Sequence, residues 1–210
     1  MTAETGTLAM ATTIGRTAKI LLAAGFAALV AACAGGGGTP TAIFDLSSTA
    51  TPAEGRSRQQ TQLLIPEPWA LKAYNTDSIA VRASPLEISY FAKVLWADRL
   101  PRLVQSKVLQ SFENSGRVRA AGLPGEGLVI NYQVLLEIRA FELRTDGSRR
   151  GYVEIAAKLL DDTNGRVVRN EVFTAESPAS SDQPEAAVAA LDRALKQVLD
   201  ALVKWTLASI

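Results

Sequence analysis

The lone cysteine of this chain, Cys33, lies directly after a short apolar segment near the N-terminus, and this arrangement limits what the rest can fold into. The segment from Ile20 to Val30 is uncharged and is too short to cross a bilayer, which takes about 20 residues. Basic residues Arg16 and Lys19 precede it and two alanines follow it. These are the three parts of a secretory signal peptide. We therefore expect residues 1–32 to be removed, so that the fold is made without them.

A cysteine at this position is the lipid acceptor in bacterial lipoprotein signals, so Cys33 is predicted to carry the acyl chains, palmitate among them, that anchor the protein to a membrane. The alternative is an incidental small residue in a signal cleaved by the ordinary peptidase. The glycine run 35–38 favours lipidation, because a flexible spacer lets a domain stand off its anchor. Ala34 is not the aspartate associated with inner-membrane retention in enteric bacteria, which favours the periplasm-facing leaflet of a Gram-negative outer membrane. Translation could begin at Met1 or Met10.

Composition excludes several classes of protein. Without residues 1–32, the 210-residue chain keeps 178 residues, enough for one domain, with 20 basic and 20 acidic residues. A chain with balanced charge and no basic stripe is not expected to bind nucleic acid. Since there is no histidine and the cysteine is used by the anchor, neither a nucleophile–histidine pair nor a zinc site can form. We expect no cofactor, no metal and no enzymatic activity.

Carboxylate-only catalysis is the remaining enzymatic alternative. Asp161 and Asp162 are adjacent, but they fall in a predicted turn. Glu137 and Glu142 are separated by an odd number of residues, so on a regular strand they face opposite sides. Neither pair is therefore predicted to act as two cooperating acids.

The mature chain divides into two parts. Residues 33–62 are rich in Gly, Ser, Thr, Ala and Pro and are predicted to form a lipidated flexible tether, in which 43–46 could add an edge strand. Residues 63–210 are predicted to form a single domain. Its first half is expected to hold short strands near 63–65, 79–81 and 86–94, the last two separated by Ser84-Pro85.

Residues 100–115 are predicted to form an amphipathic helix. Pro101 lies near its start and Gly116 just past its end, as is typical of helix termini. Its apolar residues recur at every fourth position: Leu100, Val104, Val108 and Phe112.

Alternating apolar and polar residues predict a long strand over 128–140, followed by two more strands at 153–159 and 166–174. The dipeptides Asp146-Gly147 and Asn164-Gly165 supply tight hairpin turns, so the three strands form an antiparallel meander. Charges at the turns are expected to be solvated rather than part of a site: Arg144, Arg149, Arg150, Asp161 and Asp162.

The C-terminal segment is predicted to be a long helix, with Asp182 as its cap and Glu185 completing a capping box. Its alanine-rich flank favours packing onto a sheet over a coiled coil. The chain is thus predicted to be α+β, an antiparallel β-sheet with an amphipathic helix in the middle and the long C-terminal helix packed on one face. The apolar residues of this helix are spaced three and four apart: Val188, Leu191, Leu195, Val198, Leu202 and Trp205.

Aromatic side chains could line a lipid-binding groove or fill the core, and the core is favoured. The exposed side of the sheet is another surface for a partner, and the sequence does not choose between them. The aromatic residues concerned are Trp69, Trp96, Trp205, Tyr74, Tyr90 and Phe91.

A series of short motifs follows one order along the mature chain: Leu64–Pro68, Trp96–Asp98, Leu100–Gln105, Phe112–Gly116 and Ile138–Phe141. In this order they resemble the ABC-type transport auxiliary lipoprotein family. The resemblance implies a non-catalytic outer-membrane lipoprotein that serves an MCE/ABC-type lipid transport system between the inner and outer membranes.

The partners implied by the resemblance are an MCE-domain periplasmic protein with its ABC permease and ATPase. A homo-oligomer is a further possible partner, and the sequence does not reveal whether several copies assemble. Only Cys33 transfers from the family as a functional residue, as the lipidated position. The alternative function is a structural or assembly lipoprotein of another outer-membrane export complex.

Overall fold

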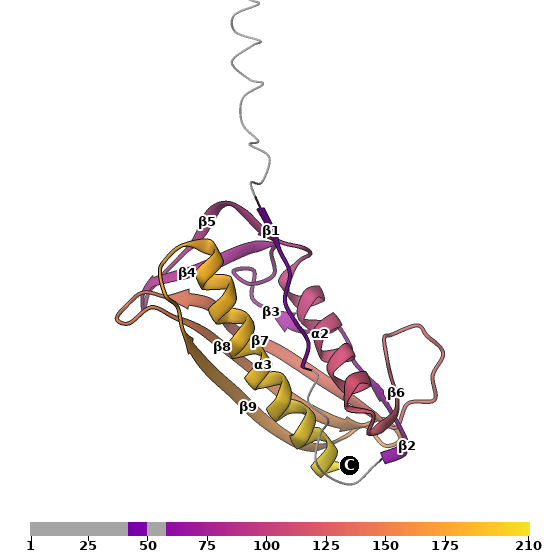
Figure 1. Ribbon diagram of the computed structural model, residues 1–210. Coiled ribbons are helices and arrows are strands. Elements are labelled where there is room, and N and C mark those ends of the chain that lie inside the picture. The colour runs from indigo at the N-terminus through magenta and orange to yellow at the C-terminus, as the bar shows by residue number, and fades with distance from the viewer. Residues whose placement is uncertain (1–41, 50–57) are drawn as a thin grey trace, which may run out of the picture. The chain divides into compact units, whose positions relative to one another are not determined.

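The computed structural model describes residues 42–49 and 58–210, within which nine strands form one sheet and two helices lie on one side of it (Figure 1). Cys33 and the predicted signal peptide lie outside these residues. The strands are β1 (Ala42–Phe44), β2 (Arg58–Leu64), β3 (Trp69–Ala70), β4 (Ser78–Ser84), β5 (Glu87–Trp96), β6 (Val118–Gly122), β7 (Tyr132–Arg144), β8 (Arg150–Asp161) and β9 (Arg166–Pro178). The helices are α2 (Leu100–Ser115) and α3 (Pro184–Ser209).

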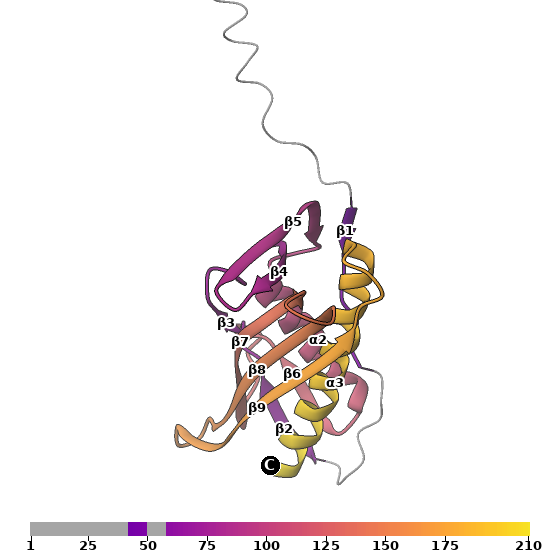
Figure 2. The same cartoon turned by 90° about the vertical axis from the view of Figure 1, so that its left-hand side faces the viewer.

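Strand β7 is the centre of the sheet. Along one edge it pairs with β8 over its whole length, and β8 in turn pairs with β9, so the three long strands lie side by side (Figure 2). Along its other edge β7 pairs successively with β2, β3 and β4. One alternating strand therefore holds together parts of the chain that are far apart in sequence.

The α+β class is confirmed, but the sheet is mixed rather than antiparallel throughout. The β7–β8–β9 meander and the β4–β5 hairpin are antiparallel, as predicted. The pairings of β1 with β5, of β2 with β6, and of β7 with β2, β3 and β4 are parallel. Parallel neighbours need long connections, and a short apolar run does not reveal in which direction its strand will run.

Helix α2 begins and ends at the predicted residues. Pro101 lies in its first turn, and Gly116 closes it in the left-handed conformation with φ of 61°. The strand predicted from residue 128 begins later, at Tyr132. The residue before it, Asn131, is bonded to Gln62 of β2 through both its backbone N–H and its side-chain oxygen, at 3.0 and 2.8 Å. These two bonds join β2 to the chain just before β7 begins.

Helix α3 packs tightly on β8 and β9, as its alanine-rich flank predicted. Gly151 of β8 makes this approach possible, because a Cβ there would lie 2.6 Å from the backbone nitrogen of Leu191. The predicted capping box is wrong: the helix is capped by Gln183 without a side-chain bond, since Pro184 sets the start of the helix after Asp182. All six apolar positions predicted for the stripe are buried.

The N-terminal described segment is bound to both helices. β1 pairs with β5 at the edge of the sheet, where an edge strand was expected. Beyond it, Asp45 forms an ion pair with Lys107 of α2 at 3.0 Å, and the backbone N–H of Ser47 donates to Asp192 of α3 at 2.7 Å. The fold thus includes residues that precede position 63.

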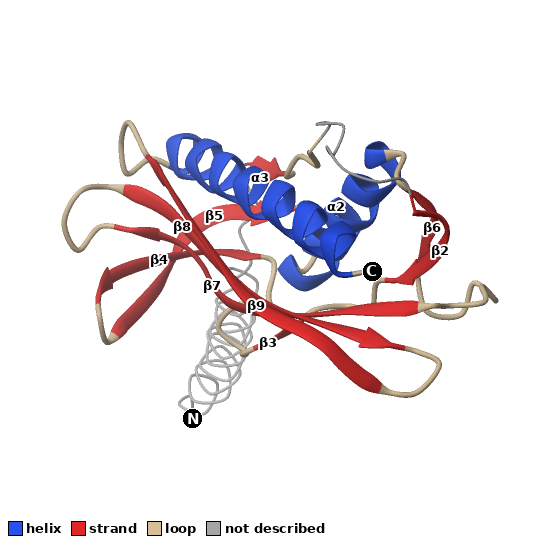
Figure 3. Ribbon diagram, turned by 90° about the horizontal axis from the view of Figure 1, so that it is seen from below, coloured by secondary structure: helices blue, strands red, loops and turns tan. Residues whose placement is uncertain are grey.

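The two faces of the meander have different surroundings. Both helices cover one face, and they bury the core between themselves and the sheet (Figure 3). Over the opposite face of β7, β8 and β9 no helix of residues 42–49 or 58–210 is placed. We call this the open face, and it positions the candidate site.

Candidate functional site: the open face of the sheet

Strand β8 supplies the middle of the open face. Its side chains alternate between the two faces, so Val153, Ile155 and Leu159 are fully buried beneath the helices. The intervening residues face the other way, and Ala156 is the smallest of them. Ala156 lies opposite Glu137 of β7 and Val172 of β9. A small side chain among longer ones leaves a hollow.

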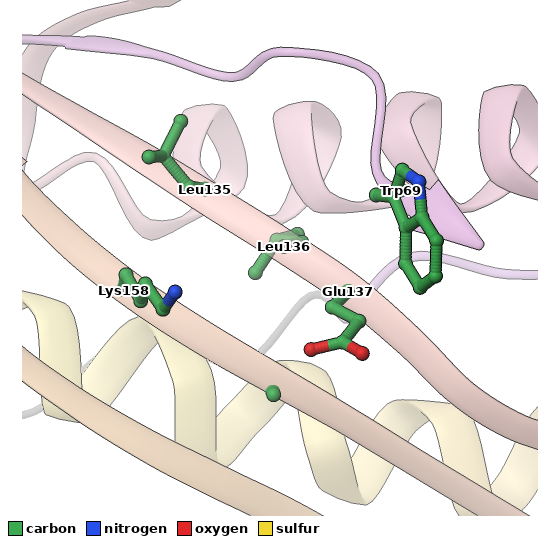
Figure 4. A pocket seen from close by; sticks show the side chains of 6 residues that line it. Trp69, Leu135, Leu136, Glu137 and Lys158 are labelled. Atoms are coloured by element: carbon green, nitrogen blue, oxygen red, sulfur yellow. The ribbon is translucent and has the colours of Figure 1, made fainter.

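This hollow has a volume of about 340 Å³ and is lined by Trp69, Leu135, Leu136, Glu137, Ala156 and Lys158 (Figure 4). Trp69 reaches it from β3, which pairs with β7 at Glu137. The Trp69 side chain is 59% exposed, whereas Trp96 and Trp205 are 3% and 8% exposed. An exposed indole beside an apolar hollow is typical of a binding surface, because it offers a large contact area together with one N–H donor.

The charges around the hollow are unevenly paired. Glu137 forms an ion pair with Arg139 at 3.3 Å, and Arg139 also approaches Glu154 at 4.0 Å. Lys158 has no ion-pair partner within the described residues. The Lys158 ammonium at the rim of the hollow is therefore not held in an ion pair, and it can contact a partner.

The expectation that Glu137 and Glu142 face opposite sides is wrong. Glu137 lies opposite Ala156 and Glu142 opposite Tyr152, two residues of β8 that share a face. A shift of register between Ile138 and Ala140 inserts one extra residue into β7, and such a bulge reverses the alternation beyond it. The two carboxylates share the open face, but only Glu137 is accessible, because Glu142 is fully buried.

Glu142 is the centre of a buried polar cluster at the end of β7. Its Oε2 accepts a hydrogen bond from the Tyr74 hydroxyl at 2.5 Å, and its Oε1 accepts bonds from Arg82 Nε at 2.6 Å and Arg144 Nε at 3.0 Å. The Arg144 guanidinium also stacks over the Tyr152 ring, 3.3 Å from its centroid. Both oxygens of the buried carboxylate are thus satisfied, as a buried charge requires.

Two groups of this cluster, Tyr74 and Arg82, have shifted pKa values. Burial, together with the hydrogen bond to Glu142, raises the pKa of Tyr74 to about 12. The hydrogen bond to Glu142 also raises the pKa of Arg82. The tyrosine stays neutral and the arginine stays charged, so these two groups do not exchange protons at neutral pH.

The prediction of solvated turn charges is wrong for Arg144, whose side chain is 23% exposed and bonds to Glu142. Arg150 also has partners, Asp146 at 3.4 Å and Glu176 at 3.2 Å. No local pattern signals the cluster around Glu142, because Tyr74 and Arg82 are 68 and 60 residues away from it in sequence.

The other predicted acids have structural contacts in the β8–β9 turn. Asp161 accepts bonds from the Thr163 backbone N–H and the Asn164 side-chain amide, each at 2.9 Å. Asp162 accepts a bond from Gln133 Nε2 at 2.5 Å. Over residues 42–49 and 58–210, no three His, Cys, Asp or Glu side chains gather as metal ligands. In the same part of the chain no helix has the length and apolar character needed to cross a membrane.

The aromatic residues divide between core and surface. Trp96, Trp205 and Tyr74 are buried, which confirms the core prediction for these three. Trp69 and Tyr90 are exposed, at 59% and 45%. No local sequence signal separates Trp69 from the buried tryptophans, because its exposure depends on how distant segments pack in the fold.

Comparison with known proteins gives a match over most of the described chain. The model of the family described as "ABC-type transport auxiliary lipoprotein component" matches residues 44–203. The protein bll6063 of Bradyrhizobium diazoefficiens is 32% identical over 177 residues, which cover 83% of this chain and 48% of that protein. The chain thus spans about half the length of that curated relative.

Solved structures with the same fold are also known. The crystal structure of XCC0632 from Xanthomonas campestris, of family DUF330, has a TM-score of 0.74 and 30% identity, and the match covers 80% of this chain and 95% of that one. A crystal structure of an uncharacterized protein has a TM-score of 0.62 at 13% identity, covering 80% of this chain and 99% of that one. The second likeness concerns the fold alone.

Proposed function

Because this chain belongs to the family of ABC-type transport auxiliary lipoprotein components, we propose that it is the outer-membrane member of an MCE-type lipid transport system. Acylated Cys33 anchors it to the periplasm-facing leaflet. Its partner is an MCE-domain periplasmic protein, which works with an ABC permease and ATPase to move lipids between the two membranes. The chain itself binds and positions this partner and catalyses no reaction.

The open face around Trp69 is the observation that carries the proposal. Binding energy at protein interfaces is concentrated in a few residues, with tryptophan, tyrosine and arginine enriched among them. Trp69 beside the hollow, with Lys158 at its rim, supplies such an anchor together with a charge that can orient the partner. The core lies on the other side of the sheet, so binding here requires no rearrangement of the fold.

The anchor is tested by Cys33→Ser. One acyl chain holds a protein weakly on a membrane and several hold it firmly, so loss of the acceptor should release a soluble periplasmic form. The measurement is the distribution of the protein between the soluble and outer-membrane fractions. Variant protein that still sediments with outer membranes would refute the role of Cys33.

The partner is tested by purifying tagged full-length protein from membranes in a mild detergent. We expect the MCE-domain protein to be recovered with wild type and to be lost with Trp69→Ala. The matched control is Leu86→Ala, which removes a fully exposed apolar side chain from the β4–β5 turn. Recovery of an export complex of the outer membrane, with the MCE protein repeatedly absent, would instead support the assembly role.

A further inference from the structure

The outer edge of β9 is a long strand edge without a neighbour. β9 has 13 residues and, within the described chain, pairs only with β8. The backbone N–H and C=O groups of β9 that point away from β8 therefore have no partner strand among the described residues. Such an edge is a template for pairing with another strand. Residues 166–172 are all exposed, so neither helix covers this part of β9.

The exposed segment Val168–Val172 is complementary to itself. Its sequence is Val-Arg-Asn-Glu-Val, in which a valine lies at each end and opposite charges flank a central Asn170. When two copies run antiparallel about Asn170, Arg169 of each lies opposite Glu171 of the other, and each Val168 lies opposite a Val172. Opposite charges and paired apolar side chains directly across two strands are both stabilising.

In this register, the side chains that lie opposite each other are on the same face of the sheet. Arg169 and Glu171 lie opposite Leu159 and Ala157 of β8, which share the helix side of the sheet. Val172 lies opposite Ala156 on the open face. The self-complementary segment begins at Val168. This residue has no partner on β8, because the pairing shifts register between Leu159 and Leu160.

Both charged residues are available for an intermolecular contact. Arg169 makes one weak hydrogen bond, to the Ser209 hydroxyl at 3.4 Å. Glu171 forms no ion pair with any described residue, and neither does Arg169. Val168 and Val172 are 45% and 44% exposed, so pairing would also remove apolar surface from water.

We propose that Val168–Val172 binds the same segment of a second copy of this chain, forming a two-fold antiparallel dimer through the edge of β9. The contact is isologous, so the pairing closes and does not propagate. With five residues on each side the interface is small, and the dimer is weak in solution. It joins the two sheets edge to edge, so that the two open faces become continuous through Val172.

A cysteine trap tests the register. In full-length Cys33→Ser protein, which has no other thiol, Asn170→Cys would place two cysteines directly opposite each other on the two-fold axis. Opposed Cα atoms in an antiparallel pair are about 4.5–5.5 Å apart, which is within reach of a disulfide. Thr174→Cys is the matched control, because Thr174 is exposed on the same strand and the same face as Asn170. In the proposed register the two substituted positions of a Thr174→Cys dimer lie eight residues apart along the strands, or about 26 Å.

We expect Asn170→Cys to form the covalent dimer at least about tenfold faster than Thr174→Cys under mild oxidation, because only its Cα separation suits a disulfide. Equal rates would overturn the register. The trap does not depend on the transport partner, so it can fail or succeed independently of the proposed function.

Charge reversal gives a second, independent test. Arg169→Glu would place Glu opposite Glu, and Glu171→Arg would place Arg opposite Arg, so each variant alone should dimerise more weakly than wild type. A mixture of the two variants restores both opposite-charge pairs and should form heterodimers. Sedimentation equilibrium over a range of concentrations measures this. Variants that associate like wild type, a mixture that fails to recover, or a wild type that stays monomeric or forms rings would overturn the proposal.

Discussion

The two faces of β8 have different surroundings, although the same strand supplies both. Towards the helices, Val153, Ile155 and Leu159 are fully buried, and Gly151 lets α3 approach the backbone. The open face has charged side chains around a hollow over Ala156. Because alternation assigns each residue to one face, we expect stability and partner binding to depend on different side chains of the same strand.

The largest expected effect is on the helix side. Leu195→Asp places an uncompensated carboxylate at a fully buried position of α3, which should cost more than about 4 kcal/mol and unfold the domain. Thermal unfolding followed by circular dichroism measures this. The control is Gln197→Asp, at an exposed position of the same helix. A folded Leu195→Asp protein that loses only partner binding would contradict the assignment of this face to stability.

The next effect concerns the buried cluster. Glu142→Ala leaves Arg82 and Arg144 without their shared counter-charge, and breaking a buried ion pair in this way costs about 3–5 kcal/mol. Glu137→Ala is the matched control, since it removes an accessible carboxylate from the same face of β7, and exposed ion pairs contribute about 0–1 kcal/mol. Urea unfolding compares the two. Equal losses would show that the open face contributes to the fold throughout.

A smaller effect should appear at high pH. Tyr74 has a pKa raised from 10.0 to about 12 in the folded protein, so the unfolded chain loses this proton first. The resulting stability is complete below pH 10 and is lost as the pH rises towards 12. The free energy of unfolding of wild type should therefore fall more between pH 9 and 11 than that of Tyr74→Phe. Parallel decreases in the two proteins would contradict the raised pKa.

The smallest expected effect on stability is at the hollow. Trp69→Ala removes a side chain that is 59% exposed, so the free energy of unfolding should change by only about 0.5 kcal/mol. The same variant should abolish recovery of the partner. A melting temperature lowered as far as that of Glu142→Ala would mean that Trp69 contributes to the fold rather than to binding.

Local sequence patterns predicted the elements better than their assembly. The bounds of α2 follow from a four-residue period between Pro101 and Gly116, and the meander follows from alternation between two tight turns. The parallel pairing of β2, β3 and β4 along β7 depends on contacts between distant segments, for which no short pattern exists. The bulge near Arg139 reversed the predicted face of Glu142 because alternation assumes an uninterrupted strand.

The candidate site could be foreseen only in outline. The sequence offered the exposed side of the sheet as a partner surface and an aromatic groove as a lipid-binding surface, although it favoured the core for the aromatic residues. It did not choose between the two surfaces. Trp69 is exposed, whereas Trp96 and Trp205 are buried. This difference depends on which side of the sheet the helices cover. The Glu142 cluster was missed because its members come from three segments that meet only in the folded chain.

Site-specific photo-crosslinking in living cells tests the central claim most directly. A photoreactive amino acid replaces Lys158 at the rim of the hollow, or replaces Lys204, which is exposed on α3. If the open face binds the transport partner, irradiation should join the MCE-domain protein to the chain from position 158 and not from position 204. Crosslinks to the MCE protein from position 204 alone, or from neither position when both proteins are present, would contradict the account.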